Sequence, residues 1–269
     1  MSSPHPPLIL CCSGLDPTGG AGIQADIEAV GALGGHALPV ITALTVQDCH
    51  DVQQLEAVDA TLIHRQINTL MADLPIAAIK LGLLGSADQV TVIAELAAQL
   101  SVPLVLDPVL RAGGGQPLVD EALCDALRAQ LLGQVTIATP NLREARALLE
   151  LPAGSDAASC ARHWQQAGCE QVLVTGGDEE TADVANYYLA ARSQVDHHND
   201  AGQWFRWPRL PGQFHGSGCT LAAAIAVLLA RGVAPAKAVF RAQAWTLQTL
   251  QQAFRPGNGQ ALPRRWPSS

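Results

Sequence analysis

Short, almost continuously apolar runs alternate with amphipathic segments along most of the chain. The apolar runs lie at 7–12, 36–47, 76–84, 102–109, 135–141 and 171–178. Such runs are typical of strands that are buried on both faces. Apolar side chains with helical spacing occur between them, at 21–33, 59–72, 87–100, 120–132, 142–150 and 156–167. Strands that alternate with helices predict an α/β fold, in which helices cover both faces of a mostly parallel sheet.

The last third of the chain departs from this alternation. Residues 183–210 read as two strands joined by a polar turn, which predicts a hairpin at one edge of the sheet. Helices at 219–231 and 235–254 follow. Ser86 and Asp120 are suited to cap the helices that begin after them. Because the sequence contains no internal repeat and no linker, we expect residues 1–269 to form one domain.

Composition limits the partners of this protein. Of the 269 residues, 48% are hydrophobic and 15% are charged, which is typical of a globular chain with a large core. The formal net charge of −8 argues against nucleic acid and against an anionic membrane surface as the main partner, because both require a basic face. An anionic small ligand stays compatible with this charge, since glycine loops and helix N-termini can bind it.

The chain carries no obvious targeting or membrane signal. Its N-terminus lacks a basic segment, and no apolar run approaches the ~18–20 residues of a membrane span. The seven cysteines are odd in number and show no C-x-x-C spacing, which argues against a disulfide framework or a structural zinc site. These features predict a cytoplasmic protein.

Polar or glycine residues follow most of the predicted strands. They are Asp16, Gly19, Gly20, Gln47, Gly82, Asp107, Asn141, Gly176 and Gly177. In an open α/β sheet, ligands bind beyond the carboxyl ends of the strands, so these residues predict a site along one rim.

Several of these motifs allow more than one interpretation. Gly20, Gly22 and Ala25 match a G-x-G-x-x-A dinucleotide fingerprint, but the loop before them is longer than the tight turn of that motif. Asn141 and Glu144 have the spacing of a helix capping box, and a carboxylate there could also orient Mg²⁺.

Asp107, which precedes a proline, is either a turn residue or an acid that faces a metal–phosphate cluster. Gly176 and Gly177 form either a simple turn or a close approach of the backbone to a nucleotide.

The segment QFHGSGCTLAAAIAVLLARG at 213–232 places Cys219 where a glycine-rich turn opens into a long apolar helix. Cys219 could be a small buried hydrophobe. Alternatively, the N–H groups of Gly216, Ser217 and Gly218 converge with the positive end of the helix dipole and form an anion site. The same field predicts a lowered pKa for the thiol. A cysteine hydrolase with His215 as the partner would use similar chemistry.

The ordered motifs SGLDPTGGAGIQADI, VITALTVQ, KLGLLGS, LDPVLRAGGG, ATPNLREA, VTGGD and FHGSGCTLAAAIA resemble those of the hydroxymethylpyrimidine/phosphomethylpyrimidine kinases of thiamine biosynthesis, over about residues 8–255. The resemblance implies a ribokinase-like, three-layer α/β/α fold. It also implies ATP- and Mg²⁺-dependent phosphorylation of 4-amino-5-hydroxymethyl-2-methylpyrimidine, then of its monophosphate, by a homodimer.

The resemblance also implies roles for individual residues. Gln47 would hydrogen-bond the pyrimidine, in a pocket shaped by Gly14, Asp16, Leu83 and Val109. Cys219 would act as the general base, and the backbone of Gly216, Ser217, Gly218 and Cys219 would hold the transferring phosphoryl group. Asp107 and Glu144 would serve Mg²⁺, while Asn141, Thr175 and Gly177 would bind the ATP phosphates.

The chain departs from the family pattern at a few positions. Thr175 and Gly114 stand where lysines are expected, and Arg111 could replace one of them. Leu83 stands in place of a methionine, and residues 108–118 could form a lid. Two alternatives therefore stay open: a pyridoxal or pyridoxine kinase, and a weakly catalytic pyrimidine-binding homologue. Gln47 favours the aminopyrimidine over pyridoxal, because its amide can both donate and accept.

Overall fold

The apolar runs form one nine-stranded sheet in the computed structural model, which describes residues 5–111, 118–191 and 202–266. In order across the sheet, the strands are β3 (Val52–Ala57), β2 (His36–Gln47), β1 (Leu8–Leu15), β4 (Ile76–Leu81), β5 (Leu104–Leu106), β6 (Ile137–Ala138), β7 (Gln171–Val174), β8 (Asp183–Leu189) and β9 (Gln203–Pro208). Pairing is parallel from β2 to β7, whereas β3, β8 and β9 are antiparallel to their neighbours. The predicted mostly parallel sheet is confirmed.

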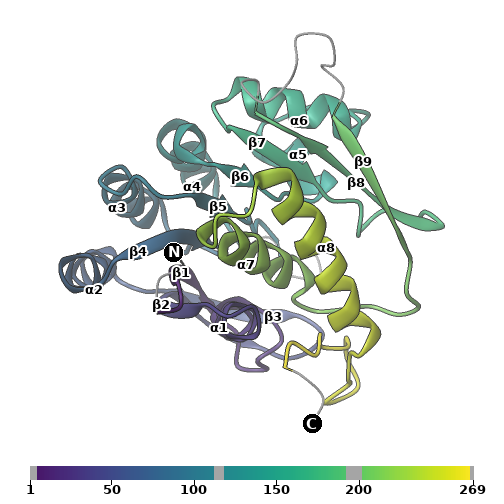
Figure 1. Ribbon diagram of the computed structural model, residues 1–269, viewed down its shortest axis with the longest axis horizontal. Coiled ribbons are helices and arrows are strands. Elements are labelled where there is room, and N and C mark those ends of the chain that lie inside the picture. Colours follow the sequence, from purple (N-terminus) through teal and green to yellow (C-terminus); the bar gives the residue numbers. More distant parts are fainter. Residues whose placement is uncertain (1–4, 112–117, 192–201, 267–269) are drawn as a thin grey trace.

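Helices cover both faces of this sheet (Figure 1). The helices are α1 (Gly22–Ala32), α2 (Ala60–Asp73), α3 (Ala87–Ala97), α4 (Glu121–Ala126), α5 (Leu142–Leu148), α6 (Ala157–Gln166), α7 (Ser217–Ala230) and α8 (Pro235–Gln251); a π-helical turn (Leu127–Leu131) and a 3-10 turn (Leu132–Gln134) continue α4. Ser86 and Asp120 cap α3 and α4 as predicted. None of these helices, within the part of the chain that the structure describes, is long and apolar enough to cross a bilayer.

Two hydrophobic clusters show which helices share a face. One cluster joins the sheet to α2–α6, through side chains such as Ile63, Ile93 and Trp164. The other joins it to α1, α7 and α8, through side chains such as Val30 and Ile225. The sheet is therefore the middle layer of three, and the predicted α/β/α architecture is confirmed. Helix α7 is buried along most of its length, which explains why its sequence has no polar face.

Several strands are shorter than their apolar runs. The run at 102–109 pairs only over Leu104–Leu106, and the run at 135–141 only over Ile137–Ala138. Each run ends near a proline, Pro108 or Pro140, which has no N–H to donate to a neighbouring strand. As a consequence Asp107 and Asn141 lie just beyond the paired residues.

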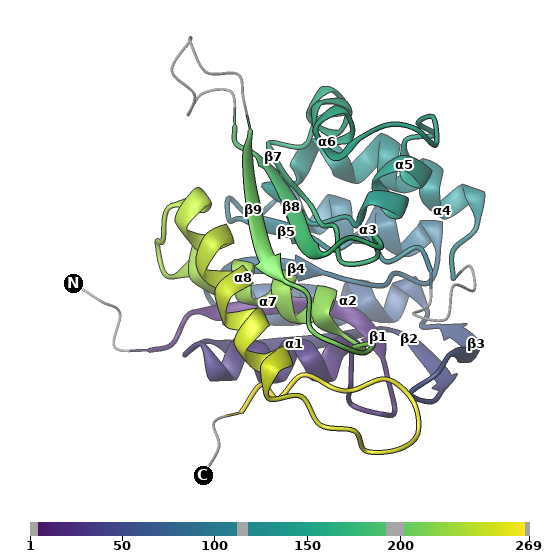
Figure 2. The ribbon, with the colours of Figure 1, turned by 90° about the vertical axis from the view of Figure 1, so that its right-hand side faces the viewer.

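The two edges of the sheet carry antiparallel strands (Figure 2). The predicted hairpin is confirmed as β8 and β9, although its turn at 192–201 lies outside the described residues. Strand β3 at the opposite edge was not predicted from the sequence. Most of its residues are exposed or half-buried, so it lacks the apolar run of a central strand. The side chain of Asp48 accepts hydrogen bonds from the N–H groups of His50 and Asp51 at 2.8 and 3.0 Å, and this turn leads from β2 into β3.

Parallel pairing places the carboxyl ends of β1, β2 and β4–β7 along one rim. Asp16, Asp107, Asn141 and Gly176 follow these ends as predicted, and Gln47 is the last residue of β2. The segment Asp16–Ala21 separates β1 from α1, which leaves a longer connection than the tight turn of a dinucleotide fingerprint. The fold therefore does not favour the dinucleotide interpretation.

Candidate active site

A cavity of about 80 Å³ at this rim contains Cys219, and we call it the Cys219 cavity. Its lining residues are Gly14, Leu15, Asp16, Ala21, Gly22, Thr45, Gln47, Val52, Leu83, Val109, Arg111, Leu118, His215 and Cys219. All five residues predicted to bind substrate therefore line the same cavity as the predicted base. The segment 213–232 and the first glycine loop, which lie about 200 residues apart in the sequence, meet here.

The loop between β1 and α1 is shaped by Asp16. Its carboxylate accepts hydrogen bonds from the N–H of Thr18 at 2.8 Å, the hydroxyl of Thr18 at 3.0 Å and the N–H of Ala21 at 2.8 Å. These bonds fold the Asp-Pro-Thr-Gly-Gly segment back on itself. Gly22 begins α1 with a φ of +57°, and a Cβ there would collide with the carbonyl oxygen of Gly14. The loop therefore requires both the acid and the glycine.

Asp16 also joins this loop to the segment before α7. His215 Nε2 lies 2.7 Å from Asp16 Oδ2, and the His215 side chain is largely buried. Burial raises the pKa of Asp16, but hydrogen bonds with His215, Gln47 and Thr18 outweigh it, so the net pKa lies below the ordinary value. Asp16 is thus a carboxylate at neutral pH. The partner that the structure gives His215 is Asp16, and this pairing does not favour a Cys–His hydrolase.

The turn before α7 needs glycine for two reasons. Gly216 adopts the left-handed region with a φ of +84°, and a Cβ on it would collide with the carbonyl oxygen of Gly20. The two glycine-bearing loops therefore touch through their backbones. Helix α7 then starts at Ser217, so its first unpaired N–H groups and its positive dipole end open beside Cys219. The turn places the start of the helix where the predicted anion site requires it, and binding of an anion there stays a prediction.

The prediction of an acidic thiol at Cys219 is wrong. Burial raises the pKa of Cys219 to about 12, and the carboxylates of Asp107 and Asp26 raise it as well. Lys80 and the N–H of Gly22 act in the opposite direction. The desolvation of a buried thiolate therefore outweighs the effects of Lys80 and Gly22, which favour ionisation. Cys219 is buried and at the same time lines the cavity, so both interpretations of its environment hold in part.

A buried ion pair lies close enough to Cys219 to affect its pKa. Lys80 Nζ lies 2.8 Å from Asp26 Oδ1, and neither side chain is exposed. Ser13 donates to Asp26 Oδ2 at 2.6 Å and accepts from Lys80 at 3.0 Å. The pKa of Lys80 is lowered by burial, but Asp26, Cys219 and Asp107 raise it, with a net increase. The sequence did not predict this pair, because nothing around a lysine within an apolar strand indicates which distant acid it will contact.

Asp107 and Glu144 form the acidic part of the site. Burial raises the pKa of Asp107 to about 6, and burial together with Asp107 raises that of Glu144 to about 8. Asp107 Oδ2 is a buried oxygen without a hydrogen-bond partner, and a Cβ on Gly218 would lie 3.6 Å from Asp107 Oδ1. The carboxylate of Asp107 is hydrogen-bonded to Cys219 but keeps one oxygen without a partner, and such an oxygen beside a proposed anion site suits a hard cation.

Within the described residues, no group of three or more His, Cys, Asp or Glu side chains is arranged to hold a metal ion. Asp107 and Glu144 nevertheless fit Mg²⁺, because this ion is commonly bound through one or two carboxylates, with the remaining ligands from phosphates and water.

The capping interpretation of Asn141 and Glu144 is confirmed. Glu144 N–H donates to Asn141 Oδ1 at 2.8 Å, and Asn141 N–H donates to Glu144 Oε2 at 3.0 Å. Asn141 also pairs with Thr175, so these two predicted ATP-binding residues lie side by side. Nothing lies within 4 Å of a Cβ built on Gly177, which leaves its backbone open to a ligand.

Arg209 is a further residue of this region that sequence reasoning missed. Its guanidinium donates to the carbonyl oxygens of Gly177 at 2.9 Å, Glu179 at 2.6 Å and Thr181 at 2.6 Å. These bonds hold the loop after β7 to the segment after β9. An arginine beyond a predicted strand gives no sequence signal for such a long-range contact.

The departures from the family pattern can be located only in part. Arg111 lines the Cys219 cavity, where it could reach a bound anion. Leu83 lines the same cavity, and a Cβ on Gly14 would lie 3.0 Å from Leu83 Cδ2, which shows how tightly this wall is packed. Gly114 lies outside the described residues, as does most of the predicted lid at 108–118.

Known proteins resemble this chain along nearly its whole length. The family model described as phosphomethylpyrimidine kinase matches residues 16–264. Hydroxymethylpyrimidine/phosphomethylpyrimidine kinases from Salmonella typhimurium and Mycobacterium tuberculosis are each 36% identical to it, over 91% and 94% of this chain and 91% and 92% of their own.

Solved structures share the fold. A pyridoxal kinase from Staphylococcus aureus in complex with AMP-PCP and pyridoxal superposes with a TM-score of 0.83 at 23% identity, covering 97% of this chain and 94% of its own. The phosphomethylpyrimidine kinase of Clostridium difficile gives a TM-score of 0.75 at 27% identity, covering 91% and 99%. The predicted ribokinase-like architecture is confirmed by this likeness, and the match in sequence shows that the chain belongs to the phosphomethylpyrimidine kinase family.

Proposed function

We propose that this protein phosphorylates 4-amino-5-hydroxymethyl-2-methylpyrimidine with ATP and then phosphorylates the monophosphate, in thiamine biosynthesis. One observation carries the proposal: the residues expected to bind the pyrimidine share a cavity with Cys219, and the N-terminus of α7 opens at that cavity. A substrate held there presents its hydroxymethyl group to an anion-binding turn. Curated relatives of this chain carry the name of the same two activities.

Gln47 is proposed to select the aminopyrimidine. Its side chain is hydrogen-bonded to the Asp16 carboxylate, which orients the amide. Because a carboxylate accepts from the amide NH₂ group, the amide oxygen and the second N–H stay available to a ligand. A 4-aminopyrimidine offers an N–H donor beside a ring-nitrogen acceptor, and an amide can satisfy both. Pyridoxal offers a different pattern of polar groups, so this geometry favours the pyrimidine.

The transferring phosphoryl group is proposed to lie at the start of α7, where the backbone of Gly216–Cys219 includes the first N–H groups of the helix, which have no partner within the helix. Phosphoryl transfer depends mostly on positioning and on stabilising charge at the phosphate oxygens. Asn141, Thr175 and Gly177 would contact the ATP phosphates from the neighbouring strand ends. Asp107 and Glu144 would hold Mg²⁺, which when bound neutralises phosphate charge.

Cys219 is proposed to accept the proton of the hydroxymethyl group. Its pKa of about 12 keeps the thiol protonated at neutral pH, so only a small fraction is competent as a base. A general base contributes about 10²–10⁴-fold, which leaves most of the rate enhancement to positioning and charge. The reaction is therefore compatible with a weakly ionised thiol, and its rate should depend on pH.

Arg111 is proposed to contact substrate or nucleotide phosphate in place of a missing lysine. It lines the Cys219 cavity, whereas Thr175 brings no positive charge to the loop after β7. Arginine binds phosphate through two parallel N–H donors. An Arg111→Met variant should raise the KM for the monophosphate more than the KM for the alcohol, because only the monophosphate carries an anion before transfer.

The proposal is tested by a coupled assay of ADP release with the aminopyrimidine alcohol, its monophosphate and pyridoxal as separate substrates. We expect turnover of both pyrimidines and a kcat/KM for pyridoxal at least about tenfold lower, since unpaired polar groups reject the wrong ligand. A Gln47→Leu variant should lose this preference. A higher kcat/KM with pyridoxal would assign the protein as a pyridoxal kinase. If no substrate releases ADP while the pyrimidine still binds by calorimetry, the protein is a pyrimidine-binding homologue.

We also propose that residues 1–269 act as one domain within a cytoplasmic homodimer. The single continuous sheet supports one domain, and the seven unpaired cysteines support a reducing compartment. Leu44 and Val46 near the exposed end of β2 are 48% and 53% exposed, which supports contact with a second copy. Light scattering on the purified protein tests the dimer, and a Val46→Glu variant should shift the mass toward the monomer.

A further inference from the structure

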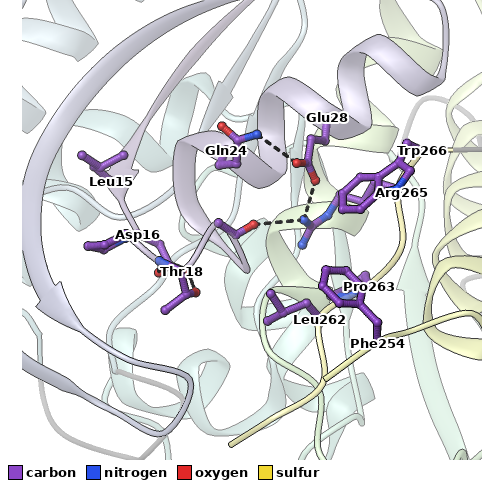
Figure 3. A pocket seen from close by; sticks show the side chains of 12 residues that line it. Leu15, Asp16, Thr18, Gln24, Glu28, Phe254, Leu262, Pro263, Arg265 and Trp266 are labelled. Carbon is purple, nitrogen blue, oxygen red and sulfur yellow. Dashed lines mark hydrogen bonds and ion pairs between the residues drawn. The ribbon is translucent and has the colours of Figure 1, made fainter. Parts of the chain in front are cut away.

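Arg265, near the C-terminus, is buried against the two loops that form the proposed active site. Its side chain is 1% exposed. Its Nε donates to Thr220 Oγ1 at 2.7 Å and its Nη1 donates to Glu28 Oε2 at 3.0 Å. It also donates to the carbonyl oxygens of Gly19, at 3.4 Å, and Gly20. Figure 3 shows the guanidinium between α1 and the loop that carries Asp16 and Thr18.

Three of these partners belong to the two segments that meet at the site, whereas Glu28 belongs to α1. Gly19 and Gly20 lie in the loop that Asp16 folds, and Thr220 directly follows Cys219 in the first turn of α7. Thr220 Oγ1 in turn donates to the carbonyl oxygen of Gly216 at 2.7 Å. A chain of hydrogen bonds therefore runs from the guanidinium through Thr220 to the residue that begins the anion-binding turn.

A second connection joins the same two loops on the side of the Cys219 cavity. This connection is the contact of Asp16 Oδ2 with His215 Nε2 at 2.7 Å. The backbones of Gly216 and Gly20 also pack directly against each other. The guanidinium of Arg265 and the Asp16–His215 pair thus hold the two loops together at separate points, and two points of attachment limit the sliding of the loops relative to each other.

The chemistry of arginine explains why this residue suits the position. The planar guanidinium presents donors in fixed directions, so one group can bind two carbonyl oxygens, a hydroxyl and a carboxylate together. A lysine ammonium has no such planar fork. Burying a cation is costly unless it is paired, and Glu28 provides the counter-charge here. The contacts are therefore specific to the shape of arginine and not only to its charge.

We propose that Arg265 is a positioning residue for phosphoryl transfer, which holds the turn Gly216–Cys219 against the loop Asp16–Gly22. In this role it would keep the phosphoryl-binding N–H groups in register with the bound pyrimidine. The inference rests on the proposed function for the reaction that it serves. The arrangement of the two loops is a property of the protein alone and can be measured without substrate.

The test compares Arg265→Met with Arg264→Met. Arg264 is the adjacent residue of the same segment and lies over the ring of Phe254, 5.8 Å from its centroid, so its loss perturbs the C-terminal segment without touching either loop. Loss of Arg265 should lower kcat for the pyrimidine alcohol by about tenfold to a hundredfold, because small misplacements of reacting groups are costly. Its KM should change by less than about threefold, and Arg264→Met should match the wild type in both constants.

Amide hydrogen exchange distinguishes a residue that positions the two loops from one that takes part directly in the reaction. In Arg265→Met, amides in the segments 14–22 and 215–221 should exchange faster than in wild type, and in Arg264→Met they should not. If Arg265→Met does not fold, Arg265→Lys and Thr220→Val are compared with the wild type instead. Smaller decreases in kcat and smaller increases in exchange are expected for these variants. Unchanged exchange together with unchanged kcat in the folded variants overturns the proposal. If the wild type lacks kinase activity but exchange responds as expected, the proposed function fails while the positioning of the loops by Arg265 stands.

Discussion

Lys80 and Asp26 form an ion pair of 2.8 Å in which neither side chain is exposed to solvent. Both charges act on the thiol of Cys219, in opposite directions, and Lys80 also interacts with Asp107. The pair therefore adds no net charge to the buried region next to Cys219, because the charges of Lys80 and Asp26 cancel. Removal of one partner exposes the site to an unbalanced buried charge.

Lys80→Met should destabilise the protein by about 3–5 kcal/mol, because Asp26 stays buried without its counter-ion. The double variant Lys80→Met/Asp26→Asn should recover most of this loss, since no uncompensated charge remains. Urea unfolding of both variants measures the two free energies. A double variant as unstable as the single one would contradict this account of the pair.

Loss of the thiol should reveal its role as the base. Cys219→Ala should lower kcat by about 10²–10⁴-fold while the pyrimidine still binds. Because the pKa of Cys219 is raised to about 12, the wild-type kcat should increase with pH over the neutral and mildly alkaline range, as the thiolate fraction increases. Cys219→Asp should restore part of the rate and remove this increase. A flat wild-type profile together with an active Cys219→Ala variant would exclude the thiol as the base.

Gly216 should not tolerate any side chain. Gly216→Ala forces a non-glycine residue to a φ of +84° and places a methyl group against the carbonyl oxygen of Gly20. Strain at such a backbone costs about 1–3 kcal/mol, and the collision adds to it. Gly154→Ala is the matched control, because nothing lies within 4 Å of a Cβ there. Thermal unfolding should show a clear decrease in Tm for the first variant only, and equal Tm values would contradict the structure of this turn.

The pKa of Glu144 predicts a dependence of stability on pH. Its pKa is raised from 4.5 to about 8 in the folded protein, mainly by burial. Between these values the folded state holds a proton that the unfolded chain has released. The stability that Glu144 contributes is therefore full below its unfolded pKa and is lost as the pH increases through about 8.

Comparison with Glu144→Gln isolates this contribution. Between about pH 4.5 and about pH 8 the wild type should lose more free energy of unfolding than the variant, whose side chain does not titrate. The variant keeps an oxygen that can accept from the N–H of Asn141, so the capping geometry is preserved. Parallel pH profiles for the two proteins would show that Glu144 is ionised in the folded state at neutral pH.

The pattern of residues along the chain determined the alternation of strands and helices, the caps at Ser86 and Asp120, and the rim of the sheet at which the site lies. These features are local, or follow from the parallel order of strands that the alternation imposes. The resemblance of the motifs added the substrate class and the roles. The local pattern was sufficient to place the site, because a residue that follows a parallel strand lies at the carboxyl edge of the sheet.

Only the tertiary structure decided the properties that depend on distant residues. The raised pKa of Cys219 follows from burial and from Asp107 and Asp26, more than 100 residues away in the sequence. The links of Arg265 to both loops, and the exposed edge strand β3, also have no local signal. Desolvation and long-range charge depend on what the folded chain packs around a group, so the spacing of residues cannot reveal them.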